Sequence, residues 1–444
     1  MNIIRVNNFL IYILAIVFQL LGITVIKVLF PNEIIIYDPR FLQVAENLLN
    51  TGSMEIHWGV GPKPADLMIN PYNIQKGIYN NWFPPAYSIF IYLNLIIDRS
   101  YTLLIFSQLI LFGLIPVIFI NILRSNFGNY LSEKHYFLIT IFFMINPYYI
   151  VSSLWKTDTW FTTFIVIFLF YILIKLDKKR TTIYAIIISA CLIILFFLRP
   201  VSIPAFIILL LIVLNKEKKN FKKLKYVGMT LIPLIITISI WTFNNYKRHN
   251  VISFTYSNVG YNLWLGNNEF TYQFLRKHLG DGATIEDFII PKFDQKWEFL
   301  SHYSEYQKDR FFRTKAIEYM INNPIITIKN MMWKFIGFWS PLRVRNGHWS
   351  DSKVKKILLL LYQTPIILLS FLSIIRWILG NNFNGLYSKY LLILLILWII
   401  PHLFFFSTTR FRAPVDFAIL IIAIDYLLPY LSKFNFYEVK NYQP

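Results

Sequence analysis

The chain has 444 residues, of which 56% are hydrophobic, 18% aromatic and 15% charged, and its mean hydropathy is +0.51. This balance excludes an ordinary soluble domain, and the recurrence of apolar runs along almost the whole chain excludes a single anchor or signal segment. The formal net charge of +20 arises largely from lysines in short segments between apolar runs, a pattern typical of topology signals rather than of nucleic-acid binding. We therefore expect a polytopic membrane protein without a nucleic-acid partner.

Ten apolar segments approach the length of a membrane-crossing helix, roughly 20 residues or somewhat fewer where flanking side chains snorkel. They are Phe9 to Phe30, Leu103 to Leu123, Tyr136 to Leu154, Thr159 to Ile174, Ile183 to Leu198, Val201 to Leu214, Val227 to Phe243, Ile357 to Ile375, Tyr390 to Phe406 and Val415 to Leu431. The expected fold class is therefore all-α and polytopic, with about ten transmembrane helices.

The lysine-rich loops predict the orientation. Lys175, Lys178, Lys179 and Arg180 follow the fourth segment, and six lysines lie within residues 215–225 after the sixth. Short cytoplasmic loops carry an excess of Lys and Arg, so we expect both loops and both termini to be cytoplasmic. The alternate connections are then extracytoplasmic.

Two of the expected outer connections are long, residues 31–102 and 244–356, and their mixed composition predicts folded structure. The expected organisation is an N-terminal transmembrane module, 1–243, that includes the first outer loop. The outer region 244–356 and C-terminal transmembrane helices with a short tail, 357–444, follow it. Chemistry is expected in the outer loops.

Helical patterns recur within these loops. Asp38 to Leu49 predicts a helix that stops at Gly52, and Tyr303 to Asn322 predicts another. Ala86 to Ile97 is too short to span comfortably, and a span here would turn the lysine loops outward, so we assign it as interfacial or re-entrant. The aromatic and lysine-containing segment Thr327 to Trp339 suits the membrane interface, where a lipid substrate would arrive.

Two aspartates at expected outer helix ends are candidates for chemistry. Asp38 follows the first apolar segment and could act as a general base toward a hydroxyl, and Asp158 lies at the outer end between the third and fourth segments. Both could equally be helix caps, and Asp38 followed by Pro39 fits that role well. Their common side suggests a shared site.

Three arginines lie amid apolar sequence on the same expected side: Arg199, Arg410 and Arg412. A guanidinium presents a planar fork of donors that suits phosphate oxygens, whereas the positive-inside bias would favour the opposite face. They could also be snorkelling anchors. A lipid phosphate would need such residues.

We expect no metal-binding site built from the side chains of this protein. The single cysteine, Cys191, excludes an intrachain disulfide and a thiolate cluster, and none of the seven histidines forms a HExxH pattern. We expect no required cofactor, although carboxylates could hold a divalent cation loosely.

Together these residues give the chain a resemblance to the glycosyltransferase family 39 group of the GT-C superfamily, which includes protein O-mannosyltransferases and lipid A aminoarabinose transferases. The order and placement of short matching pieces carry the resemblance. They are Asp38 with Ala45 to Gly52, Pro84 to Tyr87, Asn146-Pro147 before Asp158, Arg199-Pro200, Asn258 to Asn268, Asp309 to Pro324, and Arg410 to Pro414. The resemblance implies a GT-C type fold with juxtamembrane helices and a folded outer region.

The resemblance also implies residue roles. Asp38 would be the catalytic base, Asp158 would assist in holding acceptor or donor, and Arg410 and Arg412, with Arg199, would bind the donor phosphate. Candidate substrate-binding residues follow from the same matching pieces or lie beside them: Trp82, Tyr87, Asn262 and Asn267. The implied reaction is inverting transfer of a monosaccharide from a polyprenyl-phosphate donor to an extracytoplasmic hydroxyl of a cell-envelope polymer, glycolipid or protein.

Three alternatives stay open. A polysaccharide polymerase or ligase would use a diphosphate-linked oligosaccharide, and a lipid or sugar flippase would use Asp38 and Asp158 as coupling sites near the bilayer midplane. A membrane scaffold would leave the outer charged residues unexplained. The transferred sugar, the acceptor and the oligomeric state do not follow from the sequence.

Overall fold

The computed structural model describes residues 6–29, 39–58, 77–79, 81, 83–146, 149–150, 158–215, 220–277, 285–292, 299–300, 302–341, 353–405 and 409–433. Two sequence-predicted site residues, Asp38 and Trp82, lie outside these described residues. Helices dominate the described part, and its strands are the short antiparallel pair β1 (Ile56–Trp58) and β2 (Gly77–Tyr79), in which Ile56 faces Tyr79.

Six stretches of the described chain are apolar and long enough to cross a membrane. The helices concerned are α1 (Asn8–Leu29), α4 (Thr102–Phe127), α7 (Asp158–Lys178), α10 (Asn220–His249), α17 (Lys353–Ile378) and α20 (Asp416–Lys433). Shorter helices accompany them: α3 (Ala86–Ile97), α5 (Glu133–Met144), α8 (Thr182–Phe196), η5 (Pro200–Ser202) with α9 (Ile203–Asn215), and α18 (Ser388–Phe404). This composition is consistent with an all-α membrane protein. The number of about ten transmembrane helices stays a prediction.

The long helices form a bundle with one extensive apolar core. The helices are apolar around most of their circumference, so one side packs in the bundle while another faces outward. On α7, Trp160 and Leu169 are buried, whereas Phe9 and Leu21 on α1 are exposed. Outward-facing apolar side chains of this kind suit contact with lipid.

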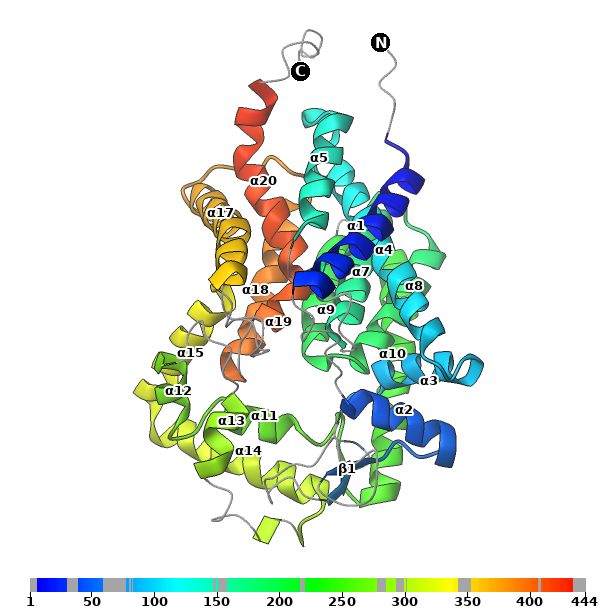
Figure 1. The fold of residues 1–444 in the computed structure, drawn as a ribbon, viewed down its shortest axis with the longest axis vertical. Coiled ribbons are helices and arrows are strands. Elements are labelled where there is room, and N and C mark those ends of the chain that lie inside the picture. Colours follow the sequence, from blue (N-terminus) through cyan, green and yellow to red (C-terminus); the bar gives the residue numbers. More distant parts are fainter. Residues whose placement is uncertain are drawn as a thin grey trace.

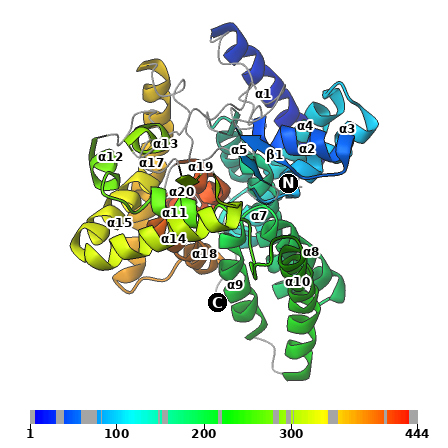
Figure 2. The ribbon, with the colours of Figure 1, turned by 90° about the horizontal axis from the view of Figure 1, so that it is seen from below.

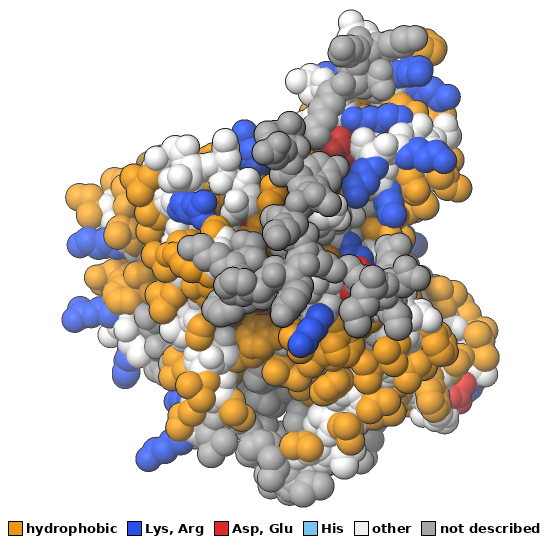
Figure 3. Space-filling view, turned by 90° about the horizontal axis from the view of Figure 1, so that it is seen from above, with side chains coloured by type: hydrophobic (Ala, Val, Ile, Leu, Met, Phe, Trp, Pro, Cys, Tyr) orange, Lys and Arg blue, Asp and Glu red, His pale blue; other side chains and the backbone are white. Residues whose placement is uncertain are grey.

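The helix ends segregate to opposite ends of the bundle (Figure 1). At one end, α1 begins and α20 ends, and Arg124 at the end of α4 pairs with Glu133 at the start of α5 at 2.5 Å. At the same end, Tyr226 near the start of α10 donates a hydrogen bond to the carbonyl of Arg180 between α7 and α8 at 2.9 Å. Seen from this end, Lys and Arg side chains outnumber acidic ones (Figure 3).

A second apolar core lies at the opposite end. It joins α2 (Pro39–Thr51), the β1–β2 pair, α11 (Val259–Leu265), α12 (Thr271–Lys277), α13 (Ile285–Ile289) and α14 (Glu305–Asn322). We call these elements the extramembrane module. Residues from both long loops of the sequence therefore fold together, and Figure 2 shows α11 and α14 lying across this end of the bundle.

The expected loop helices are confirmed. The helix predicted over 38–49 is α2, which ends at Thr51 because Gly52 has φ +72°. The helices predicted over 86–97 and 303–322 are α3 and α14, and the capping box of Ser304 and Gln307 begins α14. The segment Thr327 to Trp339, expected at the membrane interface, lies in helix α15 (Pro324–Trp339). Whether α3 is interfacial or re-entrant stays a prediction.

Candidate functional site

Three segments meet where the bundle adjoins the extramembrane module. Asp158 begins α7. Arg199 occupies the turn after α8, where its amide still donates to the Leu195 carbonyl at 2.7 Å while Pro200 starts η5. Arg410 lies in the short helix α19 (Thr409–Arg412), which leads through η8 (Ala413–Val415) into α20. Helix ends therefore supply all three side chains.

These side chains form one cluster, which we call the Arg199–Asp158–Arg410 cluster. Arg199 Nε donates to Asp158 Oδ2 at 3.1 Å, and Arg410 Nη2 donates to Asp158 Oδ1 at 2.5 Å. Thr159 Oγ1 accepts from Arg410 Nε at 2.8 Å and lies 3.4 Å from Arg199 Nη2. Both carboxylate oxygens are thus occupied by the arginines. Asp158 orients the two guanidinium groups.

The cluster carries a net charge of +1, since two guanidinium groups face one carboxylate. Asp158 and Arg199 are 8% and 6% exposed, so water does little to screen this charge. Among the described residues, Arg199 Nη1 is buried and has no hydrogen-bond partner. An anion such as a phosphate would satisfy this donor and balance the charge.

Phe411 fixes the backbone beside Arg410. Its carbonyl accepts a hydrogen bond from Trp398 Nε1 at 2.8 Å, and its ring lies 5.0 Å from the Arg199 guanidinium carbon and 5.3 Å from the His402 ring centroid. Cation–π contact and packing therefore couple α18, α19 and Arg199.

Tyr256 is a site residue that the sequence analysis did not identify. It lies close enough to Arg199, Asp158 and Asp309 for their charges to act on its hydroxyl. Burial raises the pKa of Tyr256 to about 12, and the positive charge of Arg199 opposes that shift. In the described part of the chain, its hydroxyl has no recorded hydrogen-bond partner. Tyr256 therefore lies within reach of the charges of the cluster and of Asp309 on α14.

Arg412 does not join the cluster. Its side chain is fully buried, with Nε donating to Asp416 Oδ1 at 2.7 Å, Nη1 to the Phe338 carbonyl at 3.0 Å and Nη2 to Gln363 Oε1 at 2.5 Å. All three nitrogens are occupied by contacts that link α15, α17 and α20. The expectation that Arg412 binds phosphate beside Arg410 has no support in this geometry, because its donors are used within the fold.

The predicted substrate-binding residues have different surroundings. Tyr87 is fully buried, and its hydroxyl accepts from Trp160 Nε1 at 3.3 Å. Asn262 Nδ2 donates to Asn258 Oδ1 just before α11, and Asn267 Nδ2 donates to backbone carbonyls. The hydrogen bonds described here for Tyr87, Asn262 and Asn267 run to residues outside the cluster.

A group of three or more potential metal ligands among His, Cys, Asp and Glu is not found within the described ranges. The cluster itself contains one carboxylate and two cations. Its chemistry suits an anion rather than a metal ion.

Comparison with known proteins adds no relative: no protein-family model matches the chain, and no curated protein is significantly similar to it.

Proposed function

We propose that the chain is a membrane glycosyltransferase that transfers a monosaccharide from a polyprenyl-phosphate donor to an acceptor hydroxyl. The observation that carries the proposal is the net positive Arg199–Asp158–Arg410 cluster at the junction of bundle and module, in which Arg199 Nη1 has no hydrogen-bond partner among the described residues. A lipid-linked phosphate would reach this depth from the membrane, while a polar acceptor would enter from the module.

The proposed reaction is a single displacement. Asp38 removes the proton of the acceptor hydroxyl, whose oxygen forms a bond to the anomeric carbon as the bond from that carbon to the phosphate oxygen breaks. Polyprenyl phosphate leaves with the bonding electrons, and the configuration inverts. The guanidinium groups of Arg199 and Arg410 stabilise the negative charge that develops on the phosphate, so protonation by an acid is not required.

The location of the cluster favours a transferase over a flippase. Asp158 and Arg199 lie at helix ends beside the extramembrane module, whereas coupling residues of a flippase belong near the bilayer midplane. The charged loops at the opposite end favour a cytoplasmic location for that end and an extracytoplasmic site. The acceptor would then be an envelope polymer, a glycolipid or a protein.

Binding of a polyprenyl monophosphate of defined length to the purified protein in lipid nanodiscs tests the site without knowledge of the sugar. Wild type should bind it, and Arg199→Ala should bind it at least about tenfold more weakly, because the lost charged contact is worth roughly 1.5–3 kcal/mol. Arg310→Ala removes an exposed arginine of α14 and serves as the control. Equal affinity of wild type and Arg199→Ala would contradict the proposal.

A further inference from the structure

Lys334 on α15 is a buried cation that the proposed reaction does not use. Its side chain is fully buried, and Nζ lies 3.0 Å from the carbonyl oxygen of Leu403 and 3.1 Å from that of Phe404, at the end of α18. Carbonyls in the last turn of a helix have no intrahelical donors where the helix ends. A lysine at this position satisfies them and complements the negative end of the helix.

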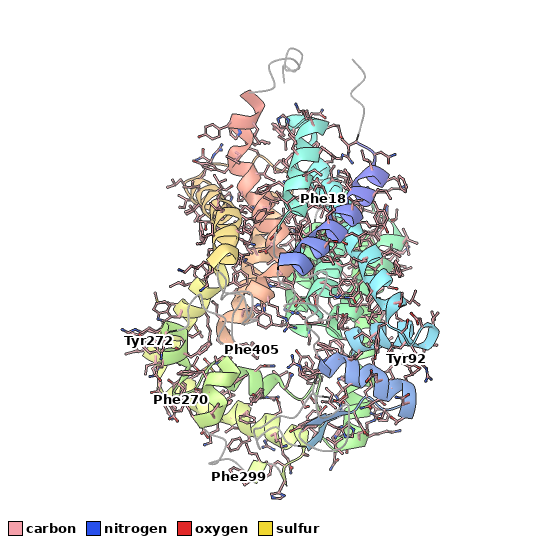
Figure 4. The ribbon with its side chains drawn as sticks, viewed as in Figure 1. Phe18, Tyr92, Phe270, Tyr272, Phe299 and Phe405 are labelled. Atoms are coloured by element: carbon pink, nitrogen blue, oxygen red, sulfur yellow. The ribbon has the colours of Figure 1, made fainter. Side chains whose placement is uncertain are left out.

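Asn267 approaches the same helix end from the module. Its Nδ2 donates to the Phe404 carbonyl at 2.6 Å, and its Oδ1 lies 3.4 Å from Lys334 Nζ. The preceding residue, Gly266, ends α11 so close to α18 that an added Cβ would lie 1.8 Å from the carbonyl oxygen of Phe405. We call Gly266, Asn267 and Lys334 the α18 clamp. Figure 4 labels Phe405 where α18 meets the module.

Helix α18 also contacts the segment that carries Arg410. Arg410 is five residues beyond Phe405 in the sequence. The carbonyl of Phe411 accepts from Trp398 on α18, and its ring packs against His402 on the same helix. A shift of α18 therefore moves the backbone that carries Arg410 relative to Asp158 on α7.

We infer that Lys334 and Asn267 are positioning residues for the anion site: by fixing the end of α18 to α15 and, through Asn267, to the extramembrane module, they hold Arg410 against Asp158. The inference rests on the proposed function, because it assigns the clamp to binding of the donor phosphate. The clamp makes the module part of the phosphate site without contacting the ligand. Loss of a charged hydrogen bond to a ligand weakens binding by at least about tenfold, so removal of the clamp should have a large effect.

Polyprenyl monophosphate binding in nanodiscs tests this assignment. Lys334→Met keeps the length of the side chain and removes its donors, and it should weaken binding at least about tenfold. Lys329→Met changes an exposed lysine of the same helix and should bind as wild type does. Gly266→Ala keeps the side chains of Lys334 and Asn267 but places a methyl group against the Phe405 carbonyl and 3.2 Å from Lys334 Nζ. It should also weaken binding while the protein stays folded by thermal denaturation.

A double-mutant cycle separates positioning from general damage. Once Arg410→Ala has removed the group that the clamp positions, adding Lys334→Met should weaken binding less than about twofold further. Additive losses in the cycle, or wild-type affinity for folded Lys334→Met and Gly266→Ala, would overturn the inference while leaving the proposed function intact. If Lys334→Met does not fold, double-mutant cycles that combine Arg410→Ala with Gly266→Ala and with Asn267→Ala test the inference instead.

The proposed function fails by a different outcome. If wild type does not bind the lipid phosphate, or if Arg199→Ala and Arg410→Ala bind it as wild type does, the anion site itself is wrong and the clamp loses its assigned role. If Arg410→Ala loses polyprenyl phosphate binding while the folded clamp variants bind as wild type does, only the role of the clamp is overturned.

Discussion

Arg410 Nη2 donates to Asp158 Oδ1 at 2.5 Å, although the two residues are 252 positions apart. The contact joins the segment before the last long helix to the first turn of α7, and Arg199 binds the other carboxylate oxygen. The tertiary fold thus assembles a charged site from three helix ends.

Asp158→Asn should destabilise the protein, because the buried guanidinium of Arg199 and the partly buried one of Arg410 would lose their shared counter-charge. Breaking a buried pair in this way typically costs about 3–5 kcal/mol. The thermal midpoint in detergent should fall, and inorganic phosphate should restore part of it because an anion can replace the carboxylate. Glu318→Gln disrupts an exposed pair with Lys315 and should change little. An unchanged midpoint for Asp158→Asn would contradict a cluster held together by this carboxylate.

Tyr256→Phe should weaken polyprenyl phosphate binding or turnover by about 10- to 100-fold without unfolding the protein. A hydrogen bond from the Tyr256 hydroxyl to a charged ligand is worth roughly 1.5–3 kcal/mol, and the structure provides the hydroxyl with no recorded protein partner in the described residues. Tyr303→Phe, at an exposed position of the module, is the matched control. Wild-type kinetics and affinity in Tyr256→Phe would remove this residue from the site.

Gly260→Ala should lower stability by about 1–3 kcal/mol, because the added methyl group overpacks the contact between α11 and α14. Its Cβ would lie 2.1 Å from the backbone oxygen of Asp309 and 2.9 Å from the amide nitrogen of Arg313. Gly228→Ala on α10 meets its nearest neighbour, Ile232, at 3.5 Å and should be neutral or stabilising. Equal free energies of unfolding for Gly260→Ala and Gly228→Ala, measured by chemical denaturation, would argue against close packing of α11 on α14.

Stability of the module should rise with pH between about 8 and 10 through Lys308. Burial lowers the pKa of Lys308 to about 8, against the opposing charge of Glu305, whereas an unfolded lysine titrates near about 10.4. Between these values the unfolded chain binds more protons, so raising the pH favours the folded state.

Thermal midpoints at pH 7.5 and 9.5 check this prediction. Wild type should gain stability relative to Lys308→Met over that interval, and Lys315→Met, at an exposed position of the same helix, should follow wild type. The same pH dependence in wild type and Lys308→Met would show that Lys308 does not supply the effect.

Local sequence signals predicted the loop helices well. The bounds of α3 match residues 86–97, because Pro84 and Pro85 precede the apolar run and Asp98 follows it. Gly52 predicted the end of α2 through its freedom to adopt positive φ. The short strands β1 and β2 were not predicted, because three-residue strands leave too little periodicity to detect.

The site was predictable only in part. The predicted topology placed Asp158, Arg199 and Arg410 on the same side of the membrane, and the structure brings the three side chains together. Arg412 has the same local signal as Arg410, two residues away, yet its partners Gln363 and Phe338 come from other helices. Lys334 likewise looked like an interfacial lysine, and only the distant end of α18 explains its burial. Such contacts depend on tertiary packing that local sequence does not encode.

The most direct test of the central claim is sugar release from a panel of polyprenyl-phosphate monosaccharides by the purified protein in lipid. We predict release or transfer from at least one donor by wild type, its abolition in Asp38→Asn, and wild-type activity in Arg310→Ala. Failure to turn over any monophosphate donor, together with activity on diphosphate-linked oligosaccharides or transbilayer movement of lipid, would contradict the assignment as a lipid-phosphate glycosyltransferase.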